Sequence, residues 1–304
     1  MRLAIRRTQI LAGLILLALE FQQVALGASK TPPQRQLVWQ PSKLLQGSPV
    51  LFQLQAPATT QAVSAVWLGH EIVFSSATRR ATSAMWYGLA GVPAETVPGT
   101  YDLLITQTRS QGKPIEIRAK IKIARALFPK VTVKVPKQYT EPSPEQLSEI
   151  SADRDLKQKI FATQSTQQQW AGAFVAPASA PISGVFGTQR IFNGAVQSRH
   201  LGLDFAVPAG TEVRTVNHGT VILARKLFFE GGCVVVDHGL GLLSLYLHLS
   251  EISVKEGEEV ASGQVLGLSG GTGRASGPHL HLAIRWQGVY LNPAILMKLK
   301  VPGD

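Results

Sequence analysis

Four histidines and one aspartate in the last third of the 304-residue chain have the types and spacing of a metal site. They occur as His200-Leu-Gly-Leu-Asp204, as Leu-Tyr-Leu-His248-Leu, and as Gly-Pro-His279-Leu-His281. Zinc accepts imidazole nitrogen and carboxylate oxygen in a tetrahedral shell, and a catalytic site uses three protein ligands and leaves one place for water. Any one of these histidines alone would more often be a core or turn residue. The five together predict a hydrolytic zinc centre.

Spacing adds detail to this prediction. The run from His279 to Trp286 alternates like a strand, so His279 and His281 would point to one face with roughly 6.6 Å between their Cα atoms. His200 and Asp204 would be roughly 13 Å apart in an extended chain, too far to share one ion. We therefore expect a bend between them, which Gly202 is placed to allow.

The elements that must position these residues are short strands separated by glycine turns. From Trp170 onward this pattern predicts an all-β domain with a folded antiparallel sheet. The candidate strands are 213–216, 219–224, 234–237, 242–248, 252–254, 265–268 and 279–286.

Three further residues, Tyr246, Cys233 and His238, lie in or next to the strand-like runs around the candidate site. Tyr246 lies two residues before His248 and so shares its strand face, which would aim the phenol at a groove or pack it in the core. Cys233 opens the run Cys-Val-Val-Val-Asp, which predicts a buried strand residue. His238 follows that run at the end of the strand and reads as a turn residue.

The ordered motifs H-x-x-x-D, H-L and H-x-H resemble those of the lysostaphin or LytM-type zinc metallopeptidases, which cut peptide bonds in peptidoglycan. The resemblance covers roughly residues 181 to 296. Its other matching phrases are Gly184-Val-Phe-Gly187, Asp204-Phe-Ala-x-Pro-x-Gly210-Thr, Asp237-His-Gly239, Gly263-Gln-x-Leu-Gly267 and Gly270-Gly-Thr-Gly-Arg274-x-x-Gly277-Pro.

This resemblance implies a zinc-dependent (Zn²⁺) endopeptidase with a duplicated-hybrid-like antiparallel sheet and a groove across one face. It implies that His200, Asp204 and His281 bind zinc and that His248 and His279 are catalytic. The phrases around Arg190 and Arg274 look most like members from double-membraned bacteria, which implies a D-alanyl to diaminopimelyl cross-link as substrate. A glycyl cross-bridge stays open. The rival function is a noncatalytic regulator of cell-wall amidases, but such relatives lose ligand residues.

The front of the chain predicts a second domain. Strand-like runs at 50–55, 101–106 and 115–123, separated by turn residues, suggest an immunoglobulin-like β-sandwich. Ser143-Pro-Glu-Gln146 resembles a capping box that begins a helix. We therefore expect four segments: a signal peptide at 1–27, a β-sandwich-like domain at 28–136, a helical linker at 137–172 and the peptidase domain at 173–304.

Charge and targeting signals indicate where the protein acts. Residues 1–172 hold 20 Lys and Arg against 10 Asp and Glu, whereas residues 173–304 hold 10 against 9. Three arginines precede an apolar run at 10–19, as in a cleaved secretory signal, so we expect export to the periplasm or cell envelope. Peptidoglycan is then the expected partner, and divisome or other cell-envelope proteins could be further ones. Nucleic acid is not expected, because the chain shows no DNA- or RNA-binding motif.

On the predicted wet face of the last front strand, Arg118, Lys120 and Lys122 recur at every second position. They could contact an anionic envelope polymer, or they could simply protect a solvated edge strand. The second interpretation is favoured, because charged residues on an edge strand are an ordinary feature of sheets.

Overall fold

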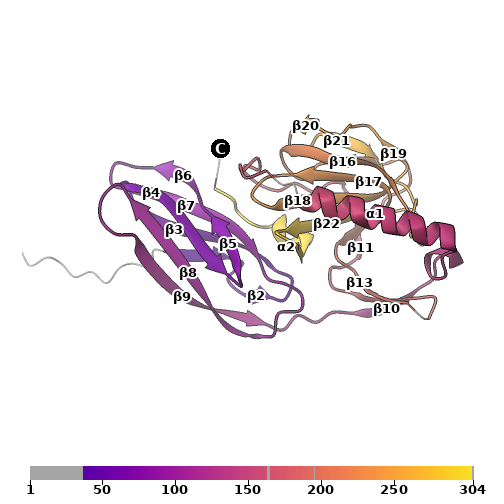
Figure 1. Ribbon diagram of the computed structural model, residues 1–304, viewed down its shortest axis with the longest axis horizontal. Coiled ribbons are helices and arrows are strands. Elements are labelled where there is room, and N and C mark those ends of the chain that lie inside the picture. The colour runs from indigo at the N-terminus through magenta and orange to yellow at the C-terminus, as the bar shows by residue number, and fades with distance from the viewer. Residues whose placement is uncertain (1–36, 163–164, 195, 303–304) are drawn as a thin grey trace, which may run out of the picture. The chain divides into compact units, whose positions relative to one another are not determined.

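A computed structural model of the chain describes residues 37–162, 165–194 and 196–302. The expected signal segment at 1–27 lies outside the described residues. Strands dominate the described ranges and helices are few (Figure 1), so the expected mainly β fold class is confirmed.

Residues 37–124 form two sheets that share one apolar core. One sheet has the order β1 (Leu37–Gln40), β3 (Pro49–Pro57), β7 (Ser83–Gly91) and β6 (Ser75–Arg79). The other has the order β2 (Leu44–Leu45), β9 (Ile115–Ala124), β8 (Gly99–Arg109), β4 (Thr60–Trp67) and β5 (His70–Val73). Phe52 of the first sheet packs edge-on against Trp67 of the second, with ring centroids 5.6 Å apart. The two sheets therefore pack as the predicted β-sandwich.

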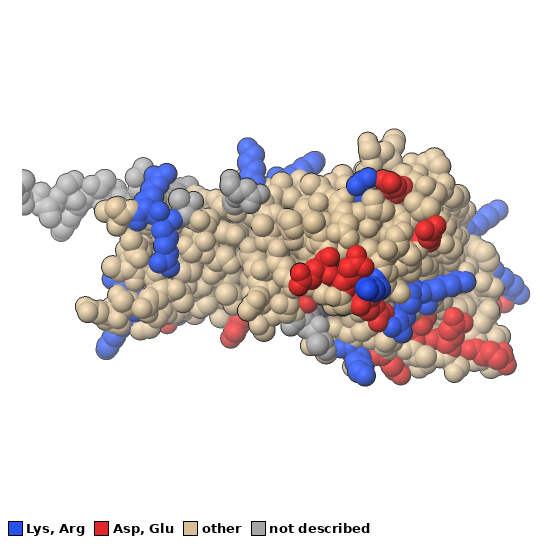
Figure 2. Space-filling view, turned by 90° about the horizontal axis from the view of Figure 1, so that it is seen from above, with Lys and Arg blue, Asp and Glu red and all other residues tan. Residues whose placement is uncertain are grey.

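The basic residues of β9 lie on its solvent face, as the alternating sequence predicts. Arg118, Lys120 and Lys122 are exposed, whereas Ile121 and Ile123 are buried. Among the described residues β9 is bordered on its outer side only by the two-residue β2, so much of it is an edge. Charged side chains on an edge discourage pairing with another chain. On the molecular face shown in Figure 2, basic and acidic side chains are interspersed over part of the surface. Edge protection remains the favoured explanation for these three residues.

The segment after the sandwich contains a strand, a short 3-10 helix and a long helix. β10 (Lys130–Val133) pairs in parallel with β12 (Gln189–Phe192), η1 spans Lys137–Tyr139, and α1 spans Pro144–Ala162. The predicted capping box begins α1, because Ser143 N donates to Gln146 Oε1 (2.9 Å) and Gln146 N donates to Ser143 Oγ (3.3 Å). Near its end, α1 packs Leu156, Ile160 and Phe161 against an apolar cluster of the large sheet.

The large sheet organises the remainder of the chain. Its order is β11 (Ile182–Gly184), β14 (Leu203–Phe205), β22 (Leu280–Trp286), β18 (Leu242–Leu249), β17 (Gly231–Asp237), β16 (Gly219–Leu227) and β20 (Glu259–Val260), with β23 (Val289–Leu291) also paired to β22. All of these pairs are antiparallel, as predicted. Two small sheets adjoin it, formed by β10, β12 and β13 (Val196–Arg199), and by β15 (Glu212–Arg214), β21 (Val265–Leu268) and β19 (Glu251–Ile252). The short helix α2 (Pro293–Leu296) follows β23.

Successive side chains of β22 point to opposite faces of the large sheet and belong to two different apolar clusters. Leu280, Leu282, Ile284 and Trp286 join the main core on one face. Ala283 joins the second cluster, together with Leu243 and Leu245, on the opposite face, against which α1 packs. Because side chains alternate along a strand, His281 lies on the same face as Ala283. We call this face the groove face.

Cys233 and His238 are both buried in this domain. Cys233 belongs to the second cluster, and burial raises the pKa of its thiol, so it stays a protonated packing residue as expected. His238 directly follows β17, as predicted, and is fully buried: its Nδ1 lies 2.6 Å from the His218 carbonyl oxygen and its Nε2 lies 2.7 Å from Ser244 Oγ. Burial lowers the pKa of His238 to about 4.

The buried His238 should make stability depend on pH. Its folded pKa is lowered below the ordinary value of 6.5, so the unfolded chain binds more protons between about pH 6.5 and pH 4. We expect the free energy of unfolding to fall as the pH is lowered through this window, by up to about 3 kcal/mol from this residue. Chemical denaturation of wild type and His238→Gln at several pH values would measure the effect. The two proteins should differ in slope between pH 6.5 and 4, and parallel curves would contradict the assignment.

Candidate metal centre and its groove

Strand register brings two of the predicted ligands together. In the antiparallel pair of β14 and β22, Asp204 lies directly opposite His281. Directly opposed residues on neighbouring strands put their side chains on the same face, close enough to touch. Asp204 Oδ1 accordingly lies 2.8 Å from His281 Nδ1, and both residues are buried.

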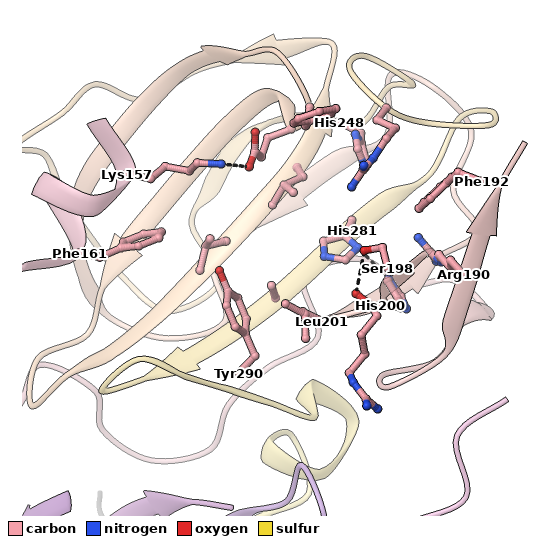
Figure 3. Close-up of a pocket in the computed structure, with 17 residues that line it drawn as sticks. Lys157, Phe161, Arg190, Phe192, Ser198, His200, Leu201, His248, His281 and Tyr290 are labelled. Carbon is pink, nitrogen blue, oxygen red and sulfur yellow. Dashed lines mark hydrogen bonds and ion pairs between the residues drawn. The ribbon is translucent and has the colours of Figure 1, made fainter. Parts of the chain in front are cut away.

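The third predicted ligand, His200, lies just before β14 and contacts both Asp204 and His281. Its Nε2 lies 2.9 Å from Asp204 Oδ1 and 2.9 Å from His281 Nδ1, and its Nδ1 lies 2.8 Å from the Val185 carbonyl oxygen. The close-up in Figure 3 shows the rings of His200 and His281 converging on one point. The three residues predicted as ligands thus form one buried His-Asp-His group.

The donor atoms of this group suit a zinc ion. A carbonyl oxygen accepts a hydrogen bond only from a protonated nitrogen, so His200 donates from Nδ1 to the Val185 carbonyl and turns Nε2 toward the group. Ligand atoms in a tetrahedral zinc shell lie about 3.3 Å apart, and the three atoms here are 2.8–2.9 Å apart. Small outward movements would therefore admit the ion, and the two nitrogens and one carboxylate oxygen fit its preferences.

Burial and hydrogen bonding keep the group in the charge state that a metal requires. Burial alone would raise the pKa of Asp204, but the hydrogen bonds and charges of His200 and His281 lower it well below its usual range. Burial lowers the pKa of His281 to about 4, against the opposing hydrogen bond with Asp204. At neutral pH the carboxylate is therefore ionised and the His281 ring is neutral, as metal ligation requires.

The second oxygen of Asp204 is held by an arginine. Arg190, on β12, forms an ion pair with Asp204 Oδ2, which leaves Oδ1 facing the two histidines. Gly184 makes room for this pair, because a Cβ at that position would lie 2.3 Å from Oδ2. The sequence motifs contain both residues but assign a role to neither. Their roles depend on contacts between separate strands, which periodicity does not report.

The two predicted catalytic histidines lie beside the group. The rings of His248 and His279 are 4.7 Å apart between centroids, and His279 Nε2 lies 3.8 Å from Asp204 Oδ1. His248 Nδ1 lies 2.8 Å from the Thr272 carbonyl oxygen, and His279 Nδ1 lies 2.8 Å from the Gly277 carbonyl oxygen. Each Nδ1 is thus engaged by the backbone, and among the described residues neither Nε2 has a hydrogen-bond partner. The structure brings all five predicted site residues together.

His248 reaches the groove face through a backbone irregularity. Between the pairs Gly232–Leu249 and Val234–Tyr246, β18 contains one residue more than β17, which is a β-bulge. His248 has a left-handed backbone with φ of +67°. The extra residue reverses the alternation, so that His248 lines the groove while Tyr246 faces the opposite core.

The expectation that Tyr246 shares the face of His248 is therefore wrong. Tyr246 is fully buried, and its hydroxyl accepts a hydrogen bond from Val216 N (2.7 Å) and lies 2.9 Å from Ser244 Oγ. The alternative of a packing role is the correct one. Period-two reasoning fails here because a bulge shifts the register by one residue.

Gly202 has a different role from the predicted one. Its φ is not in the left-handed region, so it is not required as a flexible turn residue. A Cβ at this position would instead lie 2.4 Å from the Leu282 carbonyl oxygen and 2.5 Å from His281 Nε2. Gly202 is needed because the His281 ring and its strand pass against its backbone.

Two cavities are lined by the His200, Asp204 and His281 group. One of about 250 Å³ is lined by His200, His248 and His281 on one side and by Lys157 and Phe161 of α1 on the other (Figure 3). The second, of about 430 Å³, is lined by Asp204, His279, Pro278 and residues of β10. Arg190, Phe192 and Arg274 line both. An extended polymer could therefore pass across the group.

Comparisons with known proteins agree with this site. Residues 198–293 match the model of peptidase family M23. The peptidoglycan DD-endopeptidase ShyA of Vibrio cholerae is 46% identical over 103 residues, which are 34% of this chain and 23% of ShyA. The DD-carboxypeptidase/endopeptidase Mpg of Neisseria meningitidis is 42% identical over 94 residues, 31% of this chain and 22% of Mpg. A crystal structure of a proposed M23 peptidase from Pseudomonas aeruginosa superposes with a TM-score of 0.61 at 29% identity, over 84% of this chain and 95% of that one.

The C-terminal part of the chain is thus a peptidase M23 domain, which confirms the resemblance to LytM-type enzymes. The match covers all five residues of the candidate site, from His200 to His281. The chain spans about a quarter of the length of the curated relatives that it matches.

Proposed function

We propose that this protein is a zinc-dependent endopeptidase that hydrolyses peptide cross-links of peptidoglycan during cell-wall remodelling. The observation that carries the proposal is the buried group of His200, Asp204 and His281 with the rings of His248 and His279 beside it, each held by the backbone through Nδ1. The names of the relatives ShyA and Mpg support peptidoglycan as the substrate.

In this proposal, His200 Nε2, Asp204 Oδ1 and His281 Nδ1 hold the zinc ion, and Arg190 fixes the orientation of the carboxylate. When bound, zinc lowers the pKa of water and polarises a carbonyl, which are the two effects that peptide hydrolysis requires. The neighbouring main-chain carbonyl of Val185 fixes the tautomer of His200, so the ligand set is oriented in advance.

The two remaining histidines would move protons. Hydrolysis of an amide takes one proton from water and delivers one to the departing amine. Burial, followed by the charges of His281 and His279, lowers the pKa of His248 to about 3, so this ring is neutral at pH 7, and the contact of Nδ1 with the Thr272 carbonyl leaves the lone pair on Nε2. His279 is held through Nδ1 in the same way, and its ring centroid lies 4.7 Å from that of His248. We assign the proton transfers to these two rings as a pair.

The proposed substrate lies outside the cytoplasmic membrane, so the protein would act in the periplasm or cell envelope. The leader-like pattern of residues 1–27 supports export. No helix among the described residues is long and apolar enough to cross a bilayer.

Removal of the metal should abolish activity. We expect a chelator to stop the hydrolysis of cross-linked muropeptides and added zinc to restore it, because the three ligands alone cannot activate water. Product release can be followed by chromatography, with zinc content measured in parallel and circular dichroism as the control for folding. Undiminished hydrolysis by protein shown to be free of zinc would disprove the mechanism.

The same assay separates this proposal from the rival noncatalytic regulator of amidases. A regulator would leave cross-linked muropeptides intact even when it is folded and loaded with zinc. The retention of all five site residues in one cluster favours the enzyme.

A further inference from the structure

Arg274 lies in the loop that holds both catalytic histidines. This loop, residues 271–277, supplies the Thr272 carbonyl to His248 and the Gly277 carbonyl to His279. Its backbone is anchored where Arg274 N donates to the Phe229 carbonyl oxygen (2.8 Å). The Arg274 side chain lines both cavities that meet at the metal group. It is therefore placed next to any substrate that spans the site.

Two aromatic rings hold the Arg274 guanidinium. Its central carbon lies 4.7 Å from the ring centroid of Phe192 and 4.5 Å from that of Phe229. A cation–π contact of this kind requires no conventional hydrogen-bond acceptor, so it leaves the N–H donors of the guanidinium able to bind one. The guanidinium is thus fixed in place while its donors stay available, which is a pre-organised arrangement for a planar anion.

Arg274 also has no directly bonded acidic partner among the residues that the structure describes. Four cationic residues line the two cavities, and three of them are ion-paired: Lys157 with Glu230, Arg190 with Asp204, and Arg199 with Glu95. Within the described ranges, Arg274 forms no ion pair. The Glu230 carboxylate acts on Arg274 from a distance but is itself paired with Lys157, so the half-buried guanidinium has no carboxylate in direct contact and favours a ligand that brings one.

We propose that Arg274 binds a free carboxylate of the substrate beside the scissile bond and so selects anionic cross-links. The inference rests on the proposed endopeptidase function. In a D-alanyl to diaminopimelyl cross-link, the carbon attached to the scissile nitrogen bears a free carboxylate, and this planar anion matches the fork of an arginine. A glycyl bridge has no free carboxylate at that point. Arg274 therefore favours the first of the two substrate classes that the sequence motifs leave open.

The test compares two cross-linked muropeptide dimers that differ only in this group, one with the carboxylate and one with a carboxamide. Wild-type protein should have a higher kcat/KM for the carboxylate, on the order of tenfold to a hundredfold, the usual range for a charge-assisted hydrogen bond. Arg274→Gln should bring the ratio of the two values close to one. Arg274→Met should do the same while still packing against Phe192 and Phe229.

Zinc content and melting temperature serve as readouts of structural damage. The matched control is Arg225→Gln, which removes an arginine that is paired with Glu256 on the surface and should leave the ratio as in wild type. If Arg274 only supports the loop, both variants will slow the two substrates equally and keep the ratio, which overturns the proposal. A wild-type ratio of one also overturns it. Failure of wild type to hydrolyse either dimer would instead refute the endopeptidase function itself.

Discussion

Replacing His281 by alanine should remove stoichiometric zinc, whereas replacing His279 should leave the zinc in place and abolish most of the turnover. The two histidines belong to one short motif, yet the structure gives them different surroundings. His281 Nδ1 lies within 2.9 Å of both His200 Nε2 and Asp204 Oδ1. His279 Nε2 is 3.8 Å from the same carboxylate oxygen, and its ring lies tilted against that of His248.

The size of each effect follows from these roles. Loss of one of three protein ligands leaves zinc with two, and because metal binding stabilises the folded state, His281→Ala should also melt at a lower temperature than the zinc-loaded wild type. His279→Ala should keep the melting temperature but lose on the order of a hundredfold or more in kcat, the scale of a missing general acid or base.

Metal analysis, thermal melting and muropeptide turnover should be measured on both variants side by side. His248→Ala is the matched comparison, because it should behave like His279→Ala and retain zinc. If His279→Ala loses the metal while His281→Ala keeps it, the assignment is reversed. If both variants keep zinc and activity, the site lies elsewhere.

Gly202→Ala should weaken zinc binding although it removes no ligand. The added Cβ would lie 2.5 Å from His281 Nε2 and 2.4 Å from the Leu282 carbonyl oxygen, and contacts this short force one partner to move. Leu282 is held in β22 between two other strands, so the His281 ring is the freer of the two. Displacing a ligand ring in this way should cost about tenfold to a hundredfold in zinc affinity, the range found for residues that orient ligands.

A competition titration with a chromophoric chelator would measure this loss, and turnover at saturating zinc would show whether the shifted ring still supports catalysis. Gly277→Ala is the matched control: its Cβ would meet nothing within 4 Å, and its backbone is not in the left-handed region. An unchanged zinc affinity in Gly202→Ala would show that the strand moves instead of the ring.

The sequence by itself was enough to predict the class of site and the type of fold. Imidazole and carboxylate groups have few common roles in this combination, so the types of His200, Asp204, His248, His279 and His281 predicted zinc hydrolysis before any contact was known. The alternation from Leu280 to Trp286 and the capping box at Ser143 are local patterns, which depend only on backbone geometry. Local patterns of this kind are visible in a single chain.

Tertiary structure decided how these residues meet. Asp204 faces His281 because of the register between β14 and β22, a pairing between residues 77 positions apart that no periodicity encodes. A bulge in β18 turns His248 to the groove and leaves Tyr246 in the core, so the inference from alternation failed. Gly202 turned out to be required by the close passage of His281. The pairing of Arg190 with Asp204 and the contacts of Arg274 with two phenylalanine rings are likewise properties of packed neighbours. The physical reason is that side-chain contacts between strands depend on register and on irregularities of the backbone, whereas composition and spacing report only what lies next along the chain.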